Sequence, residues 1–295
     1  MEFIKTNQIN KKIILGTAQF GSNYGISNNE EKLTKNKVIK LLNFAQKKSI
    51  NYLDVANAYK GYKKILSKIN LRKWKISTKI SKKQILKNNT EKKFYSFFYK
   101  QLKLLDQKKI EYFLFHNSAD LLTKNGEKIY KILYNLKKEN LIKKIGISIY
   151  APNEIKRITN HYKIDIVQAP YNVFDQRIDD DKLLKKLKSK NIELHVRSIF
   201  LQGLLLIKKK KIPSKFSKWS SFFDKWYNFL DNNRTNALNE CLNFVSLNKN
   251  ISKYVVGVNS LNNLKDILFT KINLSKKNFD VLKSNDINLI DPRRW

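Results

Sequence analysis

The feature that most constrains the fold is a regular alternation of short β-type runs with longer helical patterns along the 295-residue chain. Near-continuous apolar strands that alternate with helices are typical of parallel strands covered by helices. Eight such runs predict a closed (β/α)₈ barrel, and a doubly wound open sheet is the alternative. The eight expected strands are residues 13–18, 51–56, 75–80, 110–118, 143–149, 164–172, 192–199 and 251–258.

Helical periodicity fills the segments between these strands. Residues 35–48, 94–105 and 128–140 each place apolar side chains at the spacing of one helix face. Residues 271–284 show a similar pattern and predict a C-terminal helix. Helices between consecutive strands are what a parallel barrel requires.

One connection is too long for a simple crossover between two strands. It covers residues 208–250, after the seventh expected strand, and predicts an extended loop or helical insertion over the mouth of the barrel. The chain has only eight glycines and four prolines, so a flexible linker is not expected and residues 1–295 should form a single domain. The insertion carries four aromatic residues, Trp219, Phe222, Phe223 and Trp226.

Composition limits the location and the partners of the protein. The one cysteine, Cys241, cannot form an internal disulfide and fits a reducing compartment. Residues 1–12 lack the apolar core of a signal peptide, and the most apolar run, 199–207, is too short to cross a bilayer. The three histidines and one cysteine show no spacing of metal ligands. We therefore expect a cytoplasmic protein without a membrane or metal partner, while its oligomeric state is not indicated.

The net charge of +36 has two interpretations. A nucleic-acid or anionic-membrane partner would explain it, and so would a general bias of the composition toward lysine. The basic residues are spread along the whole chain, and the longest run, 208–211, falls in an expected loop, so the compositional bias is favoured. In either case the charge favours anionic ligands such as dinucleotides or sugar phosphates.

Polar side chains recur at the ends of the expected strands. In a barrel of this type, reactive groups gather at the C-terminal ends of the strands, where the side chains converge on one mouth. Each residue alone is a weak indication, but the set is informative because the barrel would bring its members together. The set consists of Asp54, Lys79, His116, Ser148, Gln168 and Asn172, with Tyr59 on the loop after the second strand.

Asp54 lies inside an apolar run, where a carboxylate is destabilising unless it is paired. Lys79, from the adjacent strand, is the expected partner. A lysine that also reaches Tyr59 would lower the tyrosine pKa from about 10 and fit the phenol for general acid–base catalysis. His116 could donate a hydrogen bond to a substrate oxygen. The set suits protonation of a carbonyl oxygen while a nicotinamide cofactor supplies hydride.

With these residues, the sequence resembles the aldo-keto reductase family along nearly its whole length. "LDVANAY" resembles the Asp-Thr-Ala-x-x-Tyr motif of that family, and "GISIY" resembles its Gly-Val-Ser-Asn-Phe motif. "ISTKI" carries the lysine, and "LFHNS" carries the histidine. Further similar segments are "LGTAQFG" at 15–21, which includes Gly16 and Thr17, "VQAPYNVFDQR" at 167–177 and "VVGVNSLNNLKDIL" at 255–268.

The resemblance implies a role for each member of a catalytic tetrad. Tyr59 would be the proton donor, Lys79 and Asp54 would tune it, and His116 would orient the carbonyl. The substrate would then be a small molecule with an aldehyde or ketone group.

The resemblance also implies a binding site for NADPH, with NADH as the other possible cofactor. Ser148 and Gln168 would hold the nicotinamide carboxamide, and the loop and helix at 255–268 would hold the adenosine phosphates. The further cofactor-binding residues implied are Gly16, Thr17, Arg197, Ser198, Gly257, Asn259, Ser260 and Asn263.

Several positions depart from the family pattern. Residues 60–63 replace the usual Gly-x-Ser-Glu, and Ile149 replaces the asparagine of the Gly-Val-Ser-Asn motif. Arg197 or Ser198 stands where many members stack an aromatic ring on the nicotinamide, and a guanidinium can also stack on a ring. Asn263 stands near a position that often carries an arginine for the adenosine 2′-phosphate. NADPH is therefore only modestly favoured over NADH.

Two segments, "TAQFGSNYGISN" and the C-terminal "DPRRW", resemble a subgroup encoded among surface-polysaccharide genes. This resemblance suggests a sugar or nucleotide-sugar carbonyl as the substrate. Two alternative functions are a non-catalytic nicotinamide-binding regulatory barrel, which the complete tetrad disfavours, and a nucleic-acid-binding protein.

Overall fold

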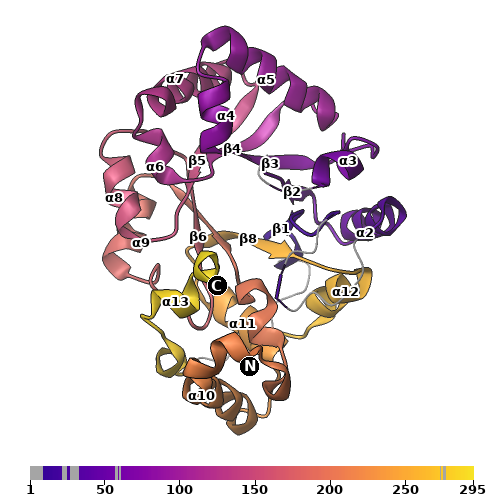
Figure 1. Cartoon of the computed structure of the whole chain (residues 1–295), viewed down its shortest axis with the longest axis vertical. Helices are drawn as coiled ribbons and strands as arrows, with labels where there is room; N and C mark the ends of the chain where they lie inside the picture. Colours follow the sequence, from indigo (N-terminus) through magenta and orange to yellow (C-terminus); the bar gives the residue numbers. More distant parts are fainter. Residues whose placement is uncertain are drawn as a thin grey trace.

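The chain forms a closed barrel of eight parallel strands in which each strand pairs with its neighbours in the sequence and β1 pairs with β8 (Figure 1). The computed structural model describes residues 9–21, 25–26, 33–56, 59, 61–272, 274 and 277–295. The barrel prediction is confirmed, and the closed order of the strands excludes an open sheet. The strands are β1 (Ile13–Gly16), β2 (Tyr52–Asp54), β3 (Lys75–Ile80), β4 (Ile110–Phe115), β5 (Ile142–Ser148), β6 (Ile166–Pro170), β7 (Glu193–Arg197) and β8 (Ile251–Gly257).

Helices surround the strands, with α4, α5 and α7 at the top of Figure 1 and α10 at the bottom. The first helix shows why these segments are helical. The Thr34 side chain caps its first turn, and its buried face is Val38, Leu41, Leu42 and Ala45, at the spacing of one helix face. The crossover helices are α2 (Lys35–Lys47), α3 (Tyr62–Leu66), α4 (Lys82–Lys87), α5 (Glu91–Leu104), α6 (Ser118–Leu121), α7 (Lys124–Lys138), α8 (Asn153–Thr159), α9 (Asp181–Ser189) and α12 (Leu261–Phe269).

The predicted insertion after β7 is helical. Phe223 and Trp226 are buried in it, and the Trp226 ring lies 6.1 Å from the ring of Phe174, in the loop after β6. The insertion thus packs on the loops at the mouth of the barrel. Its elements are the 3₁₀ turns η1 (Leu201–Leu206), η2 (Lys209–Lys211) and η3 (Ser214–Trp219) and the helices α10 (Ser220–Asn232) and α11 (Ala237–Leu247).

The C-terminal helix lies later in the chain than the sequence predicts. Within 271–284, of which residues 273, 275 and 276 lie outside the described part, the structure has only the 3₁₀ turn η4 (Phe279–Leu282). The Phe279 carbonyl accepts a hydrogen bond from Gln176, and the Ser284 amide donates to the Phe174 carbonyl. These long-range bonds take backbone groups that a continuous helix would use. The chain ends with α13 (Ile287–Ile290) and the 3₁₀ turn η5 (Pro292–Arg294).

Two apolar clusters show which side chains point into the barrel. A large cluster includes Ile13, Leu15 and Val167 together with residues of the helices, so these side chains face outward. A small cluster of Ile14, Tyr112, Leu114 and Ile166 contains strand residues alone. Because side chains alternate along a strand, the small cluster fills the interior of the barrel.

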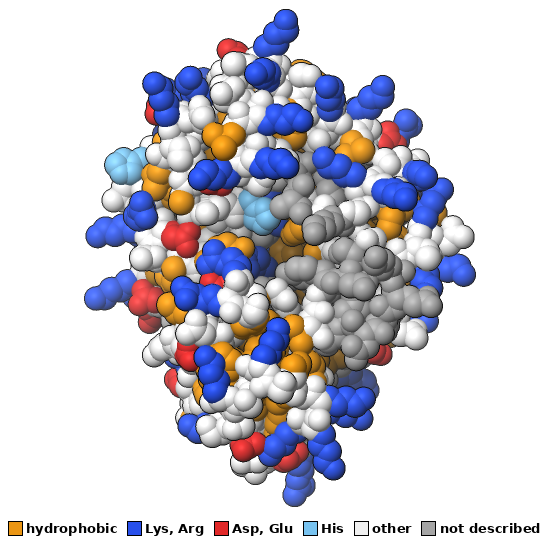
Figure 2. Space-filling model, in the orientation of Figure 1, with side chains coloured by type: hydrophobic (Ala, Val, Ile, Leu, Met, Phe, Trp, Pro, Cys, Tyr) orange, Lys and Arg blue, Asp and Glu red, His pale blue; other side chains and the backbone are white. Residues whose placement is uncertain are grey.

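Lys and Arg side chains are spread over the visible face of the molecule and do not gather in one patch (Figure 2). This distribution agrees with the even spread of basic residues in the sequence. Among the described helices, none is both long enough and apolar enough to cross a bilayer.

Candidate active site

Inward-facing positions turn from apolar to polar toward the C-terminal ends of the strands. Ile14 is followed on the same face by Gly16, Tyr52 by Asp54, and Ile166 by Gln168. A cavity of about 420 Å³ opens at this end of the barrel. The predicted residues that line it are Gly16, Asp54, Tyr59, Lys79, His116, Ser148, Gln168, Arg197, Ser198, Gly257, Asn259 and Asn263.

Asp54 is fully buried and hydrogen-bonded on both carboxylate oxygens. Lys79, also buried, donates to Oδ1 as the expected cation. Ser77 and Gln168 each donate to Oδ2 at 3.3 Å. These donors hold the buried carboxylate in one orientation.

Tyr59 reaches this ion pair from the loop after β2. Its hydroxyl lies 3.2 Å from Asp54 Oδ1 and 3.4 Å from Lys79 Nζ, and the side chain is partly exposed toward the cavity. The phenol therefore touches the buried pair on one side and the cavity on the other. This geometry allows proton exchange between the hydroxyl and a ligand in the cavity.

Burial shifts the pKa values of the basic groups around the phenol. Desolvation lowers the pKa of Lys79 from the usual value of a lysine, the Asp54 carboxylate opposes the shift, and the Arg197 charge adds to it. Desolvation, followed by the Lys79 charge, lowers the pKa of His116 to about 4. His116 is therefore neutral at pH 7, and one ring nitrogen carries a proton that it can donate.

The His116 ring stands at 89° to the Tyr59 ring, with 6.4 Å between the ring centroids. In the described part of the chain, no side chain hydrogen-bonds to the imidazole, and both rings line the cavity. A substrate oxygen placed between the two rings could accept hydrogen bonds from the Tyr59 hydroxyl and from the protonated ring nitrogen of His116. That is the arrangement that a carbonyl oxygen requires for protonation.

Several buried polar atoms in the cavity wall fit a polar ligand such as a nicotinamide dinucleotide. Gln168 uses its amide nitrogen on Asp54, and its oxygen has no partner among the described residues. Ser148 lies beside Gln168 in the register of β5 and β6. The side-chain oxygens of Asn259 and Gln19 are likewise buried without a described partner. Unpaired buried acceptors are destabilising, so a ligand that donates to them would be favoured.

Gly257, at the end of β8, permits a close approach of chain segments at the cavity wall. A Cβ at this position would lie 2.3 Å from the Gln19 amide nitrogen. Helix α12 begins just beyond, and no acidic residue stands in its first turn. The exposed amides at such a helix start favour an anion, as the phosphates of a dinucleotide require.

Two predicted cofactor residues lie outside the cavity lining. The hydroxyl of Thr17 donates to the Asp54 carbonyl at 2.9 Å and its amide to the same oxygen at 3.1 Å, so Thr17 fixes the end of β2. Ser260 caps α12, because its hydroxyl accepts from the Asn263 amide. Both side chains thus form hydrogen bonds within the protein.

The structure adds residues that the sequence prediction missed. Ser77 precedes Lys79 by two positions on the same face of β3, so strand alternation could have identified it. Tyr150 packs against the Arg197 guanidinium, whose carbon lies 4.3 Å from the ring centroid. Nothing in the local sequence indicates this contact between β7 and the loop after β5.

Within the described ranges, no three His, Cys, Asp or Glu side chains come together in a way that could hold a metal ion.

Comparisons with known proteins agree with the fold. The model of the aldo/keto reductase family matches residues 12–287. None of the curated proteins matches the chain in sequence. Among solved structures, the holo form of an aldo-keto reductase from Bacillus halodurans is similar with a TM-score of 0.72, at 16% identity over 96% of this chain and 95% of that chain. A glycerol dehydrogenase from Gluconobacter oxydans has a TM-score of 0.65, at 15% identity over 95% and 92%. Because the family model spans most of the chain, this protein belongs to the aldo/keto reductase family and is an oxidoreductase.

Proposed function

We propose that this protein reduces the carbonyl group of a small aldehyde or ketone with Tyr59 as the general acid. The observation that carries the proposal is the contact of one cavity-facing phenol with a buried Asp54–Lys79 pair. A reduced nicotinamide supplies hydride when it is bound. The protein must then supply a proton to the oxygen and stabilise the charge that develops there.

Tyr59 donates its proton to the substrate oxygen and becomes a phenolate. Lys79 stabilises this phenolate because its ammonium lies 3.4 Å from the phenol oxygen in a buried setting. Burial lowers the pKa of Lys79, and the Asp54 carboxylate opposes this shift. Asp54 therefore helps to keep Lys79 charged and in place. The neutral His116 donates a hydrogen bond to the same substrate oxygen and orients it toward Tyr59.

Other cavity residues would hold the dinucleotide. Gln168, whose side-chain oxygen has no partner among the described residues, and Ser148 beside it would hold the nicotinamide carboxamide. The start of α12 near Gly257 and Asn259 binds phosphates. Both NADPH and NADH meet these requirements. Our preference for NADPH is only modest, because Asn263 in the cavity wall carries no charge that would select the 2′-phosphate.

The substrate that we favour is a sugar or nucleotide-sugar carbonyl, in a single-domain cytoplasmic enzyme. This part of the proposal rests on the sequence resemblance to polysaccharide-associated relatives and on the positive charge of the chain, which favours anionic ligands.

Fluorescence titration with NADPH and NADH, followed by a panel of aldehydes that includes sugar aldehydes, tests the proposal. We expect both cofactors to bind, NADPH more tightly. NADH that binds about tenfold more tightly, a difference of about 1.4 kcal/mol, would overturn the preference. Absence of binding by either cofactor would overturn the enzymatic function, and binding without turnover of any carbonyl would favour a regulatory barrel.

A further inference from the structure

Arg197 is a cation in the active-site cavity without an ionic partner. It ends β7, it lines the cavity, and none of the described carboxylates lies within 4 Å of its guanidinium. It is near enough to the reacting groups that its charge contributes to the lowered pKa values of Lys79 and His116. A partly buried charge without a counterion calls for an explanation.

The guanidinium of Arg197 is fixed by neutral partners. One terminal nitrogen donates to the Ile149 carbonyl at 2.9 Å and the other to the Ser198 hydroxyl at 3.3 Å. The group also stacks on the Tyr150 ring at 4.3 Å. These contacts hold the plane of the group without neutralising it, and they leave other N–H donors available to a ligand.

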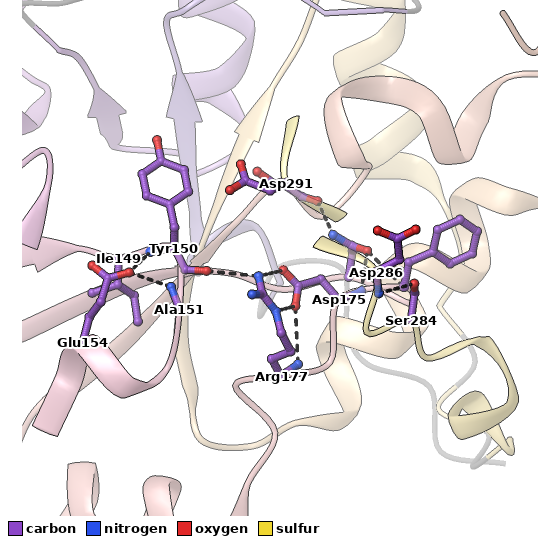
Figure 3. A network of polar contacts seen from close by, with 12 residues as sticks. Ile149, Tyr150, Ala151, Glu154, Asp175, Arg177, Ser284, Asp286 and Asp291 are labelled. Atoms are coloured by element: carbon purple, nitrogen blue, oxygen red, sulfur yellow. Dashed lines mark hydrogen bonds and ion pairs between the residues drawn. The ribbon is translucent and has the colours of Figure 1, made fainter. Parts of the chain in front are cut away.

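The backbone on both sides of this contact is held in place. Glu154 accepts from the Tyr150 and Ala151 amides at 2.9 and 2.7 Å, and Arg177 donates to the Tyr150 carbonyl at 3.0 Å (Figure 3). On the other strand, the Arg197 carbonyl accepts from the Tyr171 amide. Arg197 is therefore preorganised, which reduces the entropy lost when it binds a ligand.

Arg197 interacts electrostatically with Asp291, but the described acids near the cavity form their ion pairs with other cations. Asp54 neutralises Lys79, and His116 is uncharged at pH 7. The nearby Asp291 is paired with Arg293, with 2.9 Å between Nε and Oδ1. The other described acid of the cavity wall, Asp266, comes from α12, which packs against α2. None of these described acids forms an ion pair with Arg197.

We propose that Arg197 determines substrate specificity by binding a carboxylate or phosphate group of the carbonyl substrate. A planar guanidinium with available N–H donors matches both oxyanions. This inference rests on the proposed function and narrows it to anionic carbonyl compounds. The phosphates of the cofactor are the other source of an oxyanion, and the experiment separates the two.

The experiment compares two matched aldehydes, 4-carboxybenzaldehyde and its neutral amide, 4-carbamoylbenzaldehyde. We expect the parent to reduce the carboxylate with a kcat/KM about 10–100-fold above that of the amide, since a hydrogen bond to a charged group is worth that factor. Arg197→Met should abolish the preference, so that the ratio of the two kcat/KM values falls to about one. Arg197→Lys keeps the positive charge but lacks the planar guanidinium, so it should retain part of the preference for the carboxylate.

A binding measurement provides a readout that does not depend on turnover. Calorimetric titration of the NADP⁺-loaded protein with benzoate and with benzamide should show tighter binding of benzoate in the parent and equal binding in Arg197→Met. Arg293→Met is the matched control, because Arg293 also stacks on Tyr150, at 3.3 Å, but does not line the active-site cavity. It should keep the preference for the carboxylate. Circular dichroism checks the folding of each variant.

The outcomes distinguish this inference from the proposed function. Should Arg197→Met weaken NADP⁺ binding about tenfold and slow both aldehydes alike, Arg197 serves the cofactor and the inference is wrong. Equal binding of benzoate and benzamide by the parent would also overturn it. If the parent reduces neither aldehyde but binds benzoate through Arg197, the anion site stands and the proposed function fails.

Discussion

The two ends of the barrel each carry an ionic cluster, on β2 and β3 at the C-terminal end and on β5 and β7 at the N-terminal end. The clusters differ in burial and in access to a cavity. At the C-terminal end, Asp54 and Lys79 have side chains only 0% and 3% exposed and touch a phenol that lines the cavity. At the N-terminal end, the side chains of Lys144 and Glu193 are 27% and 33% exposed and their charges are partly solvated.

The N-terminal cluster is also more fully compensated. Glu193 is hydrogen-bonded by Lys144 and by His195, at 3.2 Å from the imidazole. Tyr52 and Tyr112 stack there with 5.5 Å between the ring centroids, and Lys253 lies 4.1 Å over the Tyr52 ring. Each of these charged groups is thus either paired within the protein or solvated. A network of this kind stabilises the fold.

The surroundings of an ion pair determine how strongly it acts on a neighbouring group and whether a ligand can reach that group. The C-terminal pair has lost its solvent, so its electrostatic effect on Tyr59 is strong, and the phenol is open to a ligand. The N-terminal pair is screened by water, and its effect is local. Changes at the C-terminal end should therefore affect turnover, and equivalent changes at the N-terminal end should affect stability alone.

The largest effect is expected for Tyr59→Phe. The substitution removes one oxygen and keeps the ring, so turnover should fall roughly 10²–10⁴-fold as the proton donor is lost. Cofactor affinity should hardly change, because the phenol acts on the substrate. Steady-state kinetics with an activated aldehyde such as a nitrobenzaldehyde, together with cofactor titration, measures both.

The matched control is Tyr52→Phe, which removes the equivalent oxygen at the N-terminal end. It should leave turnover within about threefold of the parent. If Tyr59→Phe is equally harmless while chemistry limits the rate, Tyr59 is not the acid and the contrast between the two ends fails.

A second pair of variants compares the two lysines. Lys79→Met leaves Asp54 buried without its cation, so we expect a loss of about 3–5 kcal/mol in the free energy of unfolding. The rate should fall at least about tenfold, since Lys79 stabilises the phenolate in the transition state, and cofactor affinity should stay within a few-fold. Denaturant unfolding and single-turnover kinetics measure these quantities.

Lys144→Met removes a lysine from the half-solvated pair at the other end. We expect it to lower the free energy of unfolding by about 1 kcal/mol or less, with turnover unchanged. Equal losses for the two variants would show that burial does not distinguish the pairs. A fully active Lys79→Met would contradict the proposed link between Asp54, Lys79 and Tyr59.

Strand alternation explains how much of the fold and the site could be predicted. The alternation of strands and helices was sufficient for the closed barrel, and strand-end polarity was sufficient to place Asp54, Lys79 and Gln168 in one cavity. The same alternation would also have identified Ser77, which lies on the inner face of β3 with Lys79.

Long-range contacts account for what could not be predicted. The pattern at 271–284 is helical, but the bonds from Gln176 and to Phe174 hold that segment in another conformation. A motif also does not fix the direction of a side chain, so Thr17 and Ser260 were expected in the cavity and instead bond within the protein. The stack of Arg197 on Tyr150 depends on the closure of the barrel, which juxtaposes distant loops.

A further expected effect, on stability and not on turnover, is a pH dependence at the N-terminal end. The hydrogen bond from His195, with a further contribution from Lys144, lowers the pKa of Glu193 from 4.5 to about 2. Because the folded pKa is the lower one, the stabilisation is present above about pH 4.5 and is lost as the pH falls toward about 2. Glu193→Gln should therefore be less stable than the parent at pH 6.

The difference between Glu193→Gln and the parent should shrink as the pH falls from about 4.5 to about 2, where the parent carboxyl also becomes neutral. Denaturant midpoints at half-unit pH steps measure this convergence. Turnover at pH 7 should be the same in both proteins, because Glu193 lies at the opposite end of the strands from Tyr59. A stability difference that stays constant over this range would show that the carboxylate charge does not stabilise the fold. A loss of turnover would show that the two ends of the barrel are coupled.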